Sequence, residues 1–189
     1  MQAPARTLWT IGHSTRPWDE FVALLQGESI ACLADVRRFA GSRRNPQYSP
    51  ADMGPALAGA GIDYVPMPEF GGRRTPAPDS RNGAWRVAAF RGYADYMATP
   101  EFALARERLM ARAAIQRTAV MCAEAVWWRC HRRLVSDDFV ARGWTVLHIM
   151  GPGKLQPHEL NPDARMVDGH LVYPPHADQH ELFGHRSHG

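Results

Sequence analysis

Five short apolar segments alternate with segments of helical periodicity, and this alternation limits the possible folds more than any other feature of the chain. The apolar segments are rich in β-branched residues or bounded by turn residues, as buried strands are, and they span residues 7–12, 30–36, 62–67, 119–122 and 145–150. Helices are expected between them, at residues 18–26, 50–60, 93–116 and 132–142. Strands that alternate with helices favour an α/β fold with a mostly parallel, five-stranded sheet flanked by helices.

Capping and turn residues support these boundaries. Ser49 and Thr99 each precede a proline, the arrangement of an N-cap followed by a first-turn proline, so Thr99 is expected to divide the long helical region in two. The Asp168–Gly169 pair between two short apolar runs predicts a small C-terminal β-hairpin. Residues 69–86 contain several Gly and Pro residues and show no clear period, which predicts a long loop.

The size and composition indicate a single α/β domain. A chain of 189 residues is long enough for one good core, which is expected over residues 7–151, with the hairpin and a tail at 152–189. No apolar run approaches about 18 residues, so no membrane partner is expected, and the first residues lack the order of a signal peptide. Three cysteines fit no disulfide framework, so a reducing, cytoplasmic environment is expected. The sequence leaves the oligomeric state open.

The basic residues are almost all arginine, 21 against a single lysine. The planar guanidinium binds phosphate or carboxylate through two hydrogen bonds at once, and residues 37–91 contain nine Arg but only four acidic residues. This segment predicts a cationic face toward an anionic small molecule, although a GC-rich coding bias also replaces Lys by Arg. The formal net charge of +3 is too small to require nucleic acid as the partner.

Polar, reactive side chains lie at or near the carboxyl ends of all five predicted strands, with His148 near the end of the fifth. The carboxyl ends of parallel strands lie at one edge of a sheet, where α/β proteins bind their ligands. The candidate catalytic residues at this edge are His13, Asp35, Cys122 and Glu124, and the candidate ligand-binding residues are Ser14, Arg37, Gly72, Arg73, His131 and Arg132. The last two open a helix whose free N–H groups and dipole favour a bound anion.

Structural roles are the alternatives for several of these residues. Asp35 and Arg37 point to the same side of a strand and can form a structural ion pair. An apolar-flanked cysteine such as Cys122 is usually inert, and His13 can instead cap the following helix. Glu124 is the better acid/base candidate, because a carboxylate directly after a buried strand must be paired or used.

No cofactor is predicted, because the chain has no Walker loop and no Gly-x-Gly-x-x-Gly sequence. The alternative is a metal site at His13, Cys122, His131 and His148, with Cys130 as a further ligand. The spacing of these residues does not match a zinc finger. Six residues and no glycine separate Cys122 from Arg129, so the segment does not match a phosphatase thiolate loop either.

Motifs along most of the chain resemble those of one known family. They are Thr-Ile-Gly-His-Ser-Thr-Arg (10–16), Asp-Val-Arg-Arg-Phe (35–39), Gly-Ser-Arg-Arg-Asn-Pro (41–46), Gly-Gly-Arg-Arg (71–74), Met-Cys-Ala-Glu (121–124) and Cys-His-Arg-Arg-Leu (130–134). With these motifs the chain resembles the bacterial domain-of-unknown-function family 488 over about residues 7–183. The resemblance implies a small cytoplasmic α/β domain without an established activity, and it implies Arg43, Arg44 and Tyr93 as additional ligand-binding residues. Residues 126–128 depart from the family pattern, which has a proline-containing turn there in many relatives.

Three functions follow, in decreasing order of support. The first is an enzyme, a hydrolase or group transferase that binds a phosphorylated or nucleotide-like ligand in the cleft, with Glu124 as general acid/base. The second is a nucleic-acid-binding or regulatory module, in which the Arg-rich segment contacts phosphates and the tryptophans at 85, 127 and 128 stack on bases. The third is a thiol redox or sulfur-transfer protein that uses Cys122 and Cys130.

Overall fold

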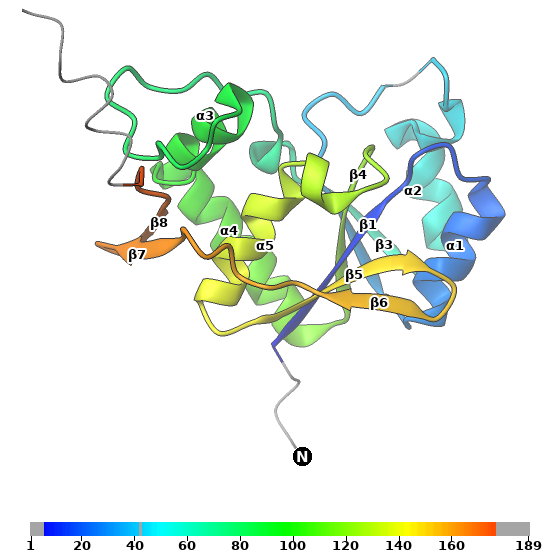
Figure 1. Cartoon of the computed structure of the whole chain (residues 1–189). Coiled ribbons are helices and arrows are strands. Elements are labelled where there is room, and N and C mark those ends of the chain that lie inside the picture. Colours follow the sequence, from blue (N-terminus) through cyan, green and yellow to red (C-terminus); the bar gives the residue numbers. More distant parts are fainter. Residues whose placement is uncertain (1–5, 42, 177–189) are drawn as a thin grey trace, which may run out of the picture.

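The computed structural model describes residues 6–41 and 43–176, and at its centre is a six-stranded sheet with the order β3-β2-β4-β1-β5-β6 (Figure 1). Five strands are parallel: β1 (Thr7–Gly12), β2 (Cys32–Asp35), β3 (Asp63–Pro66), β4 (Thr118–Cys122) and β5 (Thr145–Gly151). The sixth, β6 (Lys154–Pro157), runs antiparallel to β5 at the edge of the sheet. The predicted α/β class with a mostly parallel sheet is confirmed.

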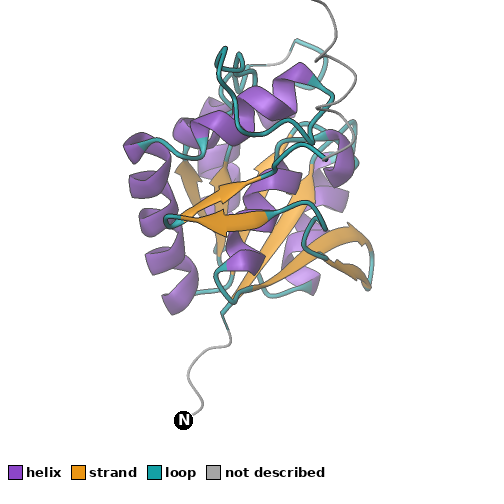
Figure 2. Ribbon diagram, turned by 60° about the vertical axis from the view of Figure 1, so that its left-hand side comes forward, coloured by secondary structure: helices purple, strands orange, loops and turns teal. Residues whose placement is uncertain are grey.

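Helices cover both faces of this sheet (Figure 2). One face is covered by α1 (Trp18–Gly27) and α2 (Pro50–Gly59), and the other by α3 (Ala88–Tyr96), α4 (Pro100–Ile115) and α5 (Arg132–Ala141). A hairpin of β7 (Arg165–Val167) and β8 (His170–Val172) packs with the second group. Three short 3-10 helices lie in the connections, η1 (Pro46–Tyr48), η2 (Pro68–Phe70) and η3 (Trp127–Arg129).

Each face of the sheet has its own hydrophobic core. Successive residues of a strand point to opposite faces, so Leu8 of β1 packs with α4 and α5 whereas Ile11 packs with α1 and α2. Phe21 of α1 and Phe102 of α4 are completely buried on the two faces. Burial of a side chain of this size contributes about 1.5–3 kcal/mol, so the two cores hold the sheet edge in place from both sides.

The capping and turn predictions are confirmed. Ser49 and Thr99 cap α2 and α4, because each side chain accepts a hydrogen bond from the backbone N–H three residues further on. Asp168 and Gly169 connect β7 to β8 and have φ angles of 49° and 79°, as a type I′ turn requires. The end of the predicted tail, residues 177–189, lies outside the described residues.

One strand is absent from the prediction. The sequence of β6, Lys-Leu-Gln-Pro, shows no strand pattern because all four residues are exposed and the last is proline. The sequence feature that could have indicated this strand is the pair Gly151 and Gly153 directly after β5, which allows the chain to turn back. In the structure Gly153 has a φ of 64°. Within the described part of the chain, no helix combines the length and the apolar character needed to cross a membrane.

The connections around β4 define where a ligand can enter. β4 lies between β2 and β1, whose chains continue to α2 and α1 on one face, whereas the chain after β4 continues to α5 on the opposite face. Loops that diverge in this way leave a crevice at the carboxyl ends of the strands. In Figure 1 these loops lie together at the upper end of the sheet.

Candidate functional site

The chain segments after β1 and β4 are joined by backbone hydrogen bonds. The N–H of His13 donates to the carbonyl of Cys122, and the N–H of Ser14 donates to the carbonyl of Ala123, both at 3.0 Å. This approach requires glycine at position 12, because a Cβ there would lie 1.8 Å from the carbonyl oxygen of Glu124. Two distant segments of the sequence therefore meet at one edge of the sheet.

The candidate residues at this edge divide between two hollows. The first, which we call the thiol pocket, has a volume of about 260 Å³ and includes seven of the predicted residues: Arg37, Gly72, Arg73, Tyr93, Cys122, Glu124 and His131. It also includes Cys130, which the sequence indicated only as a metal ligand or redox thiol, and six residues outside the prediction, namely Arg38, Phe39, Ala89, Phe90, Ala123 and Arg129. The second hollow contains His13 and Ser14, and it shares Arg37, Phe39 and Ala123 with the first.

Two cysteines lie side by side in the thiol pocket. Cys122 is the last residue of β4 and Cys130 directly precedes the N-cap of α5, and their sulfur atoms are 2.8 Å apart. The Cys130 sulfur also accepts a hydrogen bond from the Arg132 N–H at 3.4 Å. Free N–H groups and the dipole at a helix N-terminus stabilise an anion, so Cys130 is placed where a thiolate is favoured.

The two ring nitrogens of His131 have different hydrogen-bond partners. Its Nε2 lies 3.2 Å from the carbonyl oxygen of Val36, which only accepts, so Nε2 carries a hydrogen and donates it. Nδ1 faces the sulfur of Cys130 at 3.5 Å. It either accepts the thiol proton or, once protonated, donates to the thiolate. Gly72 leaves room for this ring, since a Cβ there would lie 3.0 Å from Nδ1.

The two thiols have opposite acidities. Burial raises the pKa of Cys130, but the hydrogen bond from Cys122 and the interactions with His131 and Arg132 outweigh this effect and hold that pKa well below the usual range. Burial and the neighbouring Cys130 sulfur raise the pKa of Cys122 well above its usual range. The proton of the pair therefore stays on Cys122, and the thiolate forms on Cys130.

Arg132 lies beneath the thiol pocket, with only 2% of its surface exposed. It donates to the hydroxyl of Thr10 at 3.3 Å and to the carbonyl of Glu124 at 2.7 Å, and its buried Nε has no partner. Among the described residues, no carboxylate forms an ion pair with it. A buried cation needs a counter-charge, and the Cys130 thiolate meets that need.

A chain of buried hydrogen bonds continues from Arg132 into the core. Thr10 contacts His148 at 2.6 Å, His148 contacts His158 at 2.9 Å, and His158 contacts Asp137 at 2.8 Å. Asp137 only accepts, so the Nε2 of His158 donates to it. Burial, together with the electrostatic influence of His158 and Arg132, lowers the pKa of His148 to about 2, so the ring of His148 is neutral near neutral pH.

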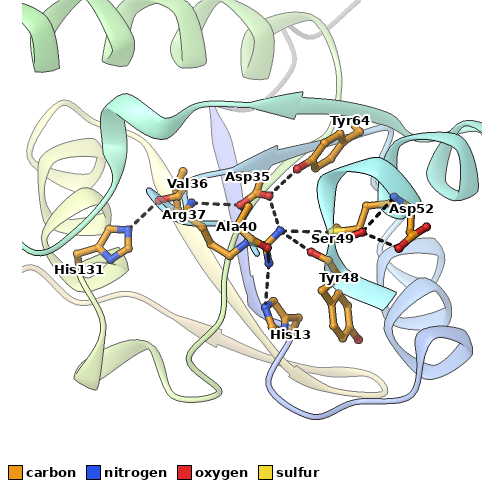
Figure 3. A network of polar contacts seen from close by, with 11 residues as sticks. His13, Asp35, Val36, Arg37, Ala40, Tyr48, Ser49, Asp52, Tyr64 and His131 are labelled. Carbon is orange, nitrogen blue, oxygen red and sulfur yellow. Dashed lines mark hydrogen bonds and ion pairs between the residues drawn. The ribbon is translucent and has the colours of Figure 1, made fainter. Parts of the chain in front are cut away.

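His13, Asp35 and Arg37 form a second polar network (Figure 3). Arg37 is paired with both carboxylate oxygens of Asp35, at 2.8 and 2.6 Å, and donates to the carbonyls of Ala40 and Tyr48. The structural ion pair is therefore present, and the guanidinium of Arg37 is committed to the loop after β2.

Both ring nitrogens of His13 are also engaged. Nδ1 donates to the carbonyl of Ser14 at 2.8 Å, so Nε2 is the acceptor for Arg37 at 3.3 Å. Burial, assisted by the charge of Arg37, lowers the pKa of His13. The ring is neutral and stacks on Tyr48 with a centroid separation of 4.1 Å, which places His13 as a support for Arg37.

The rim of the thiol pocket is cationic and partly apolar. Arg38, Arg73 and Arg129 line it together with Phe90 and the 68%-exposed Phe39. Glu124 is the acidic residue of the lining, and its exposed carboxylate has no hydrogen bond or ion pair with the described residues. The rim therefore combines three guanidiniums with aromatic apolar surface.

Several predicted residues have other surroundings. Arg43 and Arg44 are exposed and line neither hollow. Tyr93 is a buried wall residue whose hydroxyl donates to the carbonyl of Phe70 at 2.7 Å. Ser14 and Arg73 have φ angles of 50° and 60°, an uncommon backbone conformation that is concentrated at functional sites.

Sequence reasoning named Cys130 as a metal ligand and as the redox partner of Cys122, but not among the catalytic residues of the enzyme hypothesis. The sequence signal for a reactive Cys130 is its position just before the predicted helix at residues 132–142 and next to His131. A helix N-terminus and a neighbouring histidine both lower the pKa of a thiol. Arg38 directly follows the predicted Arg37, and Arg129 directly precedes Cys130. Their position on the rim depends on loop conformation, which strand and helix periodicity does not specify.

The tryptophans proposed to stack on bases are largely packed inside the protein. Trp85 is buried against Phe90 and Tyr173, and Trp127 stacks on His148 with a centroid separation of 4.3 Å. Trp128 is exposed over 43% of its surface. Two of the three indoles are therefore committed to packing in this structure.

The proposed metal ligands are dispersed. Cys122, Cys130 and His131 lie in the thiol pocket, His13 lies in the second hollow, and His148 is held in the buried chain. Over residues 6–41 and 43–176, no group of three or more His, Cys, Asp or Glu residues has the arrangement of a metal site.

Comparison with known proteins identifies the family but no named relative. The pattern of the family described as domain of unknown function DUF488 matches residues 17–139. No curated protein and no solved structure matches the chain. The matched region contains β2, β3, β4, most of α5 and both cysteines of the thiol pocket. The chain belongs to the family of the domain of unknown function DUF488.

Proposed function

We propose that this protein is an enzyme, a hydrolase or group transferase that acts on a small phosphorylated or nucleotide-like anion through a nucleophilic thiolate at Cys130. The observation that supports this proposal most directly is the surroundings of the Cys130 sulfur. It lines the thiol pocket at the N-terminus of α5, 3.5 Å from Nδ1 of His131 and 3.4 Å from the Arg132 N–H. A thiolate beside an imidazole is an activated nucleophile.

The lining of the pocket supports an anionic substrate. Arg38, Arg73 and Arg129 lie on the rim, where their guanidiniums can form paired hydrogen bonds with a phosphate or carboxylate. Phe39 and Phe90 provide apolar surface beside them. The pocket volume of about 260 Å³ is smaller than that of pockets for drug-sized ligands, which is about 300–1,000 Å³. This size favours a small molecule over a dinucleotide.

The residues have distinct roles in the proposed reaction. The Cys130 thiolate forms a bond to the electrophilic atom of the transferred group, and the bond to the leaving group breaks. Glu124 or the imidazolium of His131 supplies the proton that the leaving group takes up. Water or a second acceptor then displaces the group from sulfur, and its proton passes to the same Glu124 or His131, so that the thiolate and the acid are both restored. Arg132 and the buried chain behind it hold the thiolate in place without touching the substrate.

The test is turnover and covalent labelling of the full chain with nucleotides, sugar phosphates and activated phosphate esters. We expect one substrate class to leave a mass adduct on Cys130 during turnover. The Cys130→Ser variant should lose at least about 10³-fold in kcat/KM, and Glu124→Gln should lose about 10²–10⁴-fold in kcat.

The matched control is Cys32→Ser, because Cys32 is completely buried at the start of β2 and lines neither hollow. This variant should keep the activity of the wild type. Turnover that survives Cys130→Ser, or tight binding of these anions with no turnover, would contradict the proposal.

A further inference from the structure

We propose that Cys130 and Cys122 form a reversible disulfide upon exposure to hydrogen peroxide, and that this oxidation switches the thiol pocket off. Cys130 is also the nucleophile of the proposed function, but the disulfide requires no substrate. The modification site is therefore a pair of thiols at the ends of β4 and the loop before α5.

The geometry of the pair suits this chemistry. The two sulfur atoms are in direct contact at 2.8 Å, whereas the bond length of a disulfide is about 2.05 Å. Both cysteines line the thiol pocket, so a molecule as small as hydrogen peroxide can reach them. The third cysteine, Cys32, is completely buried within β2 and lines neither hollow.

The reaction proceeds in two balanced steps. The Cys130 thiolate attacks one oxygen of hydrogen peroxide, the O–O bond breaks, and hydroxide leaves, so that Cys130 becomes a sulfenic acid. The sulfur of Cys122 then attacks the sulfur of Cys130, and the S–O bond breaks. The departing hydroxide takes the proton of Cys122 and leaves as water. The dithiol loses two electrons, and peroxide is reduced to water.

The contacts around Cys130 make the disulfide easy to reduce. The Arg132 N–H, the His131 ring and the buried guanidinium of Arg132 all favour a negative charge on Cys130. A disulfide is uncharged, so it loses these interactions and leaves Arg132 without its counter-charge. Selective stabilisation of the reduced form makes a disulfide more oxidising, so thiol reductants should restore the active site.

The experiment treats the reduced wild-type protein with a small excess of hydrogen peroxide and maps its peptides. Trypsin cleaves between the two cysteines, after Arg129, so the disulfide should join residues 118–129 to residues 130–132. The intact protein should become lighter by two hydrogen atoms and lose iodoacetamide labelling at Cys130. Glutathione should reverse both changes.

Two variants separate the steps. In Cys122→Ser, peroxide should add one oxygen to Cys130, and dimedone should trap the sulfenic acid. In His131→Gln, the equilibrium with glutathione should shift about tenfold toward the disulfide, because the thiolate has lost a stabilising neighbour. Cys32→Ser should behave as the wild type.

The outcomes distinguish this inference from the proposed function. If Cys130 is labelled by iodoacetamide near neutral pH but peroxide gives only sulfinic or sulfonic acid, or a disulfide that involves Cys32, the disulfide switch is wrong and the nucleophile remains. If neither iodoacetamide nor peroxide modifies Cys130 in the folded protein, both proposals are wrong. Peptide mapping of the wild-type protein distinguishes these outcomes even if a variant does not fold.

Discussion

At the scale of single residues, the site depends on how closely two backbone segments approach each other. Gly12 ends β1 directly against the carbonyl of Glu124, and the guanidinium of Arg132 lies on the same side. A methyl group at this position would meet both of them. The absence of a side chain at one residue thus permits the contact on which the thiol pocket is built.

The substitution Gly12→Ala tests this contact. The added Cβ would lie 1.8 Å from the Glu124 oxygen and 2.9 Å from Arg132, so the backbone must move, and we expect a loss of about 3 kcal/mol in the free energy of unfolding. The control is Gly27→Ala at the end of α1, where nothing lies within 4 Å. It should stabilise the protein by about 0.4–1 kcal/mol. Denaturant unfolding measures both, and equal effects would show that Gly12 is not a tight contact.

Residue types alone indicated several of the chemical groups in the site but not their partners. Glu124 and Cys122 were predicted as reactive residues and line the thiol pocket. His13 and Asp35 were predicted as well, but both are hydrogen-bonded to Arg37. Which side chain finds a partner depends on loop conformation. The pairing of Cys122 with Cys130 across seven residues depends on the turn at η3, which no periodicity in the sequence describes.

At the scale of elements, the loop after β2 is organised around one buried ion pair. Arg37 links Asp35 of β2 to the carbonyls of Ala40 and Tyr48, and Tyr64 of β3 donates to Asp35 at 2.6 Å. The loop forms a wall shared by both hollows. Its shape is therefore set from inside the protein rather than by a ligand.

The substitution Asp35→Asn should collapse this arrangement. It leaves the buried Arg37 without its counter-charge, and we expect a loss of about 3–5 kcal/mol in the free energy of unfolding. Glu20→Gln is the control, because it breaks the exposed pair of Arg16 and Glu20 and should change stability by less than about 1 kcal/mol. Chemical denaturation of the two variants measures the difference. Similar losses in both would contradict a special role for Asp35.

The order of strands and helices was predictable because it follows from periodicity. The apolar runs at residues 7–12 and 145–150 correspond closely to β1 and β5, since they are buried on both faces of the sheet. The exposed edge strand β6 has no such pattern and was not predicted. Convergence of polar residues at the carboxyl edge follows from parallel topology, but the division into two hollows depends on side-chain packing.

At the scale of the whole molecule, the buried chain from Arg132 to Asp137 couples the site to the core and makes stability depend on pH. The folded-state pKa of His148 is lowered to about 2, whereas an unfolded histidine titrates near 6.5. Between these values the unfolded chain binds a proton that the folded chain does not. Stability from this residue is therefore present above about pH 6.5 and lost as the pH falls.

The loss should reach at most about 1.4 kcal/mol for each pH unit below 6.5 from His148 alone. In His148→Gln, the amide can accept from one neighbour and donate to the other, Thr10 or His158, so the hydrogen-bond chain persists without the titratable ring of residue 148. We expect this variant to have a shallower dependence of stability on pH than the wild type. Unfolding free energies measured from pH 4 to pH 7 test this, and identical slopes would argue against a neutral, buried His148.

The most direct test of the account is the pH dependence of Cys130 alkylation by iodoacetamide, followed site by site with mass spectrometry. In the folded protein we predict that Cys130 reacts with a midpoint well below that of an ordinary thiol, while Cys122 and Cys32 remain unlabelled near neutral pH. The denatured chain should label all three alike. If Cys130 in the folded protein reacts only at the alkaline pH of a free cysteine, or if Cys122 is labelled first, a thiolate at the N-terminus of α5 is not the centre of this site.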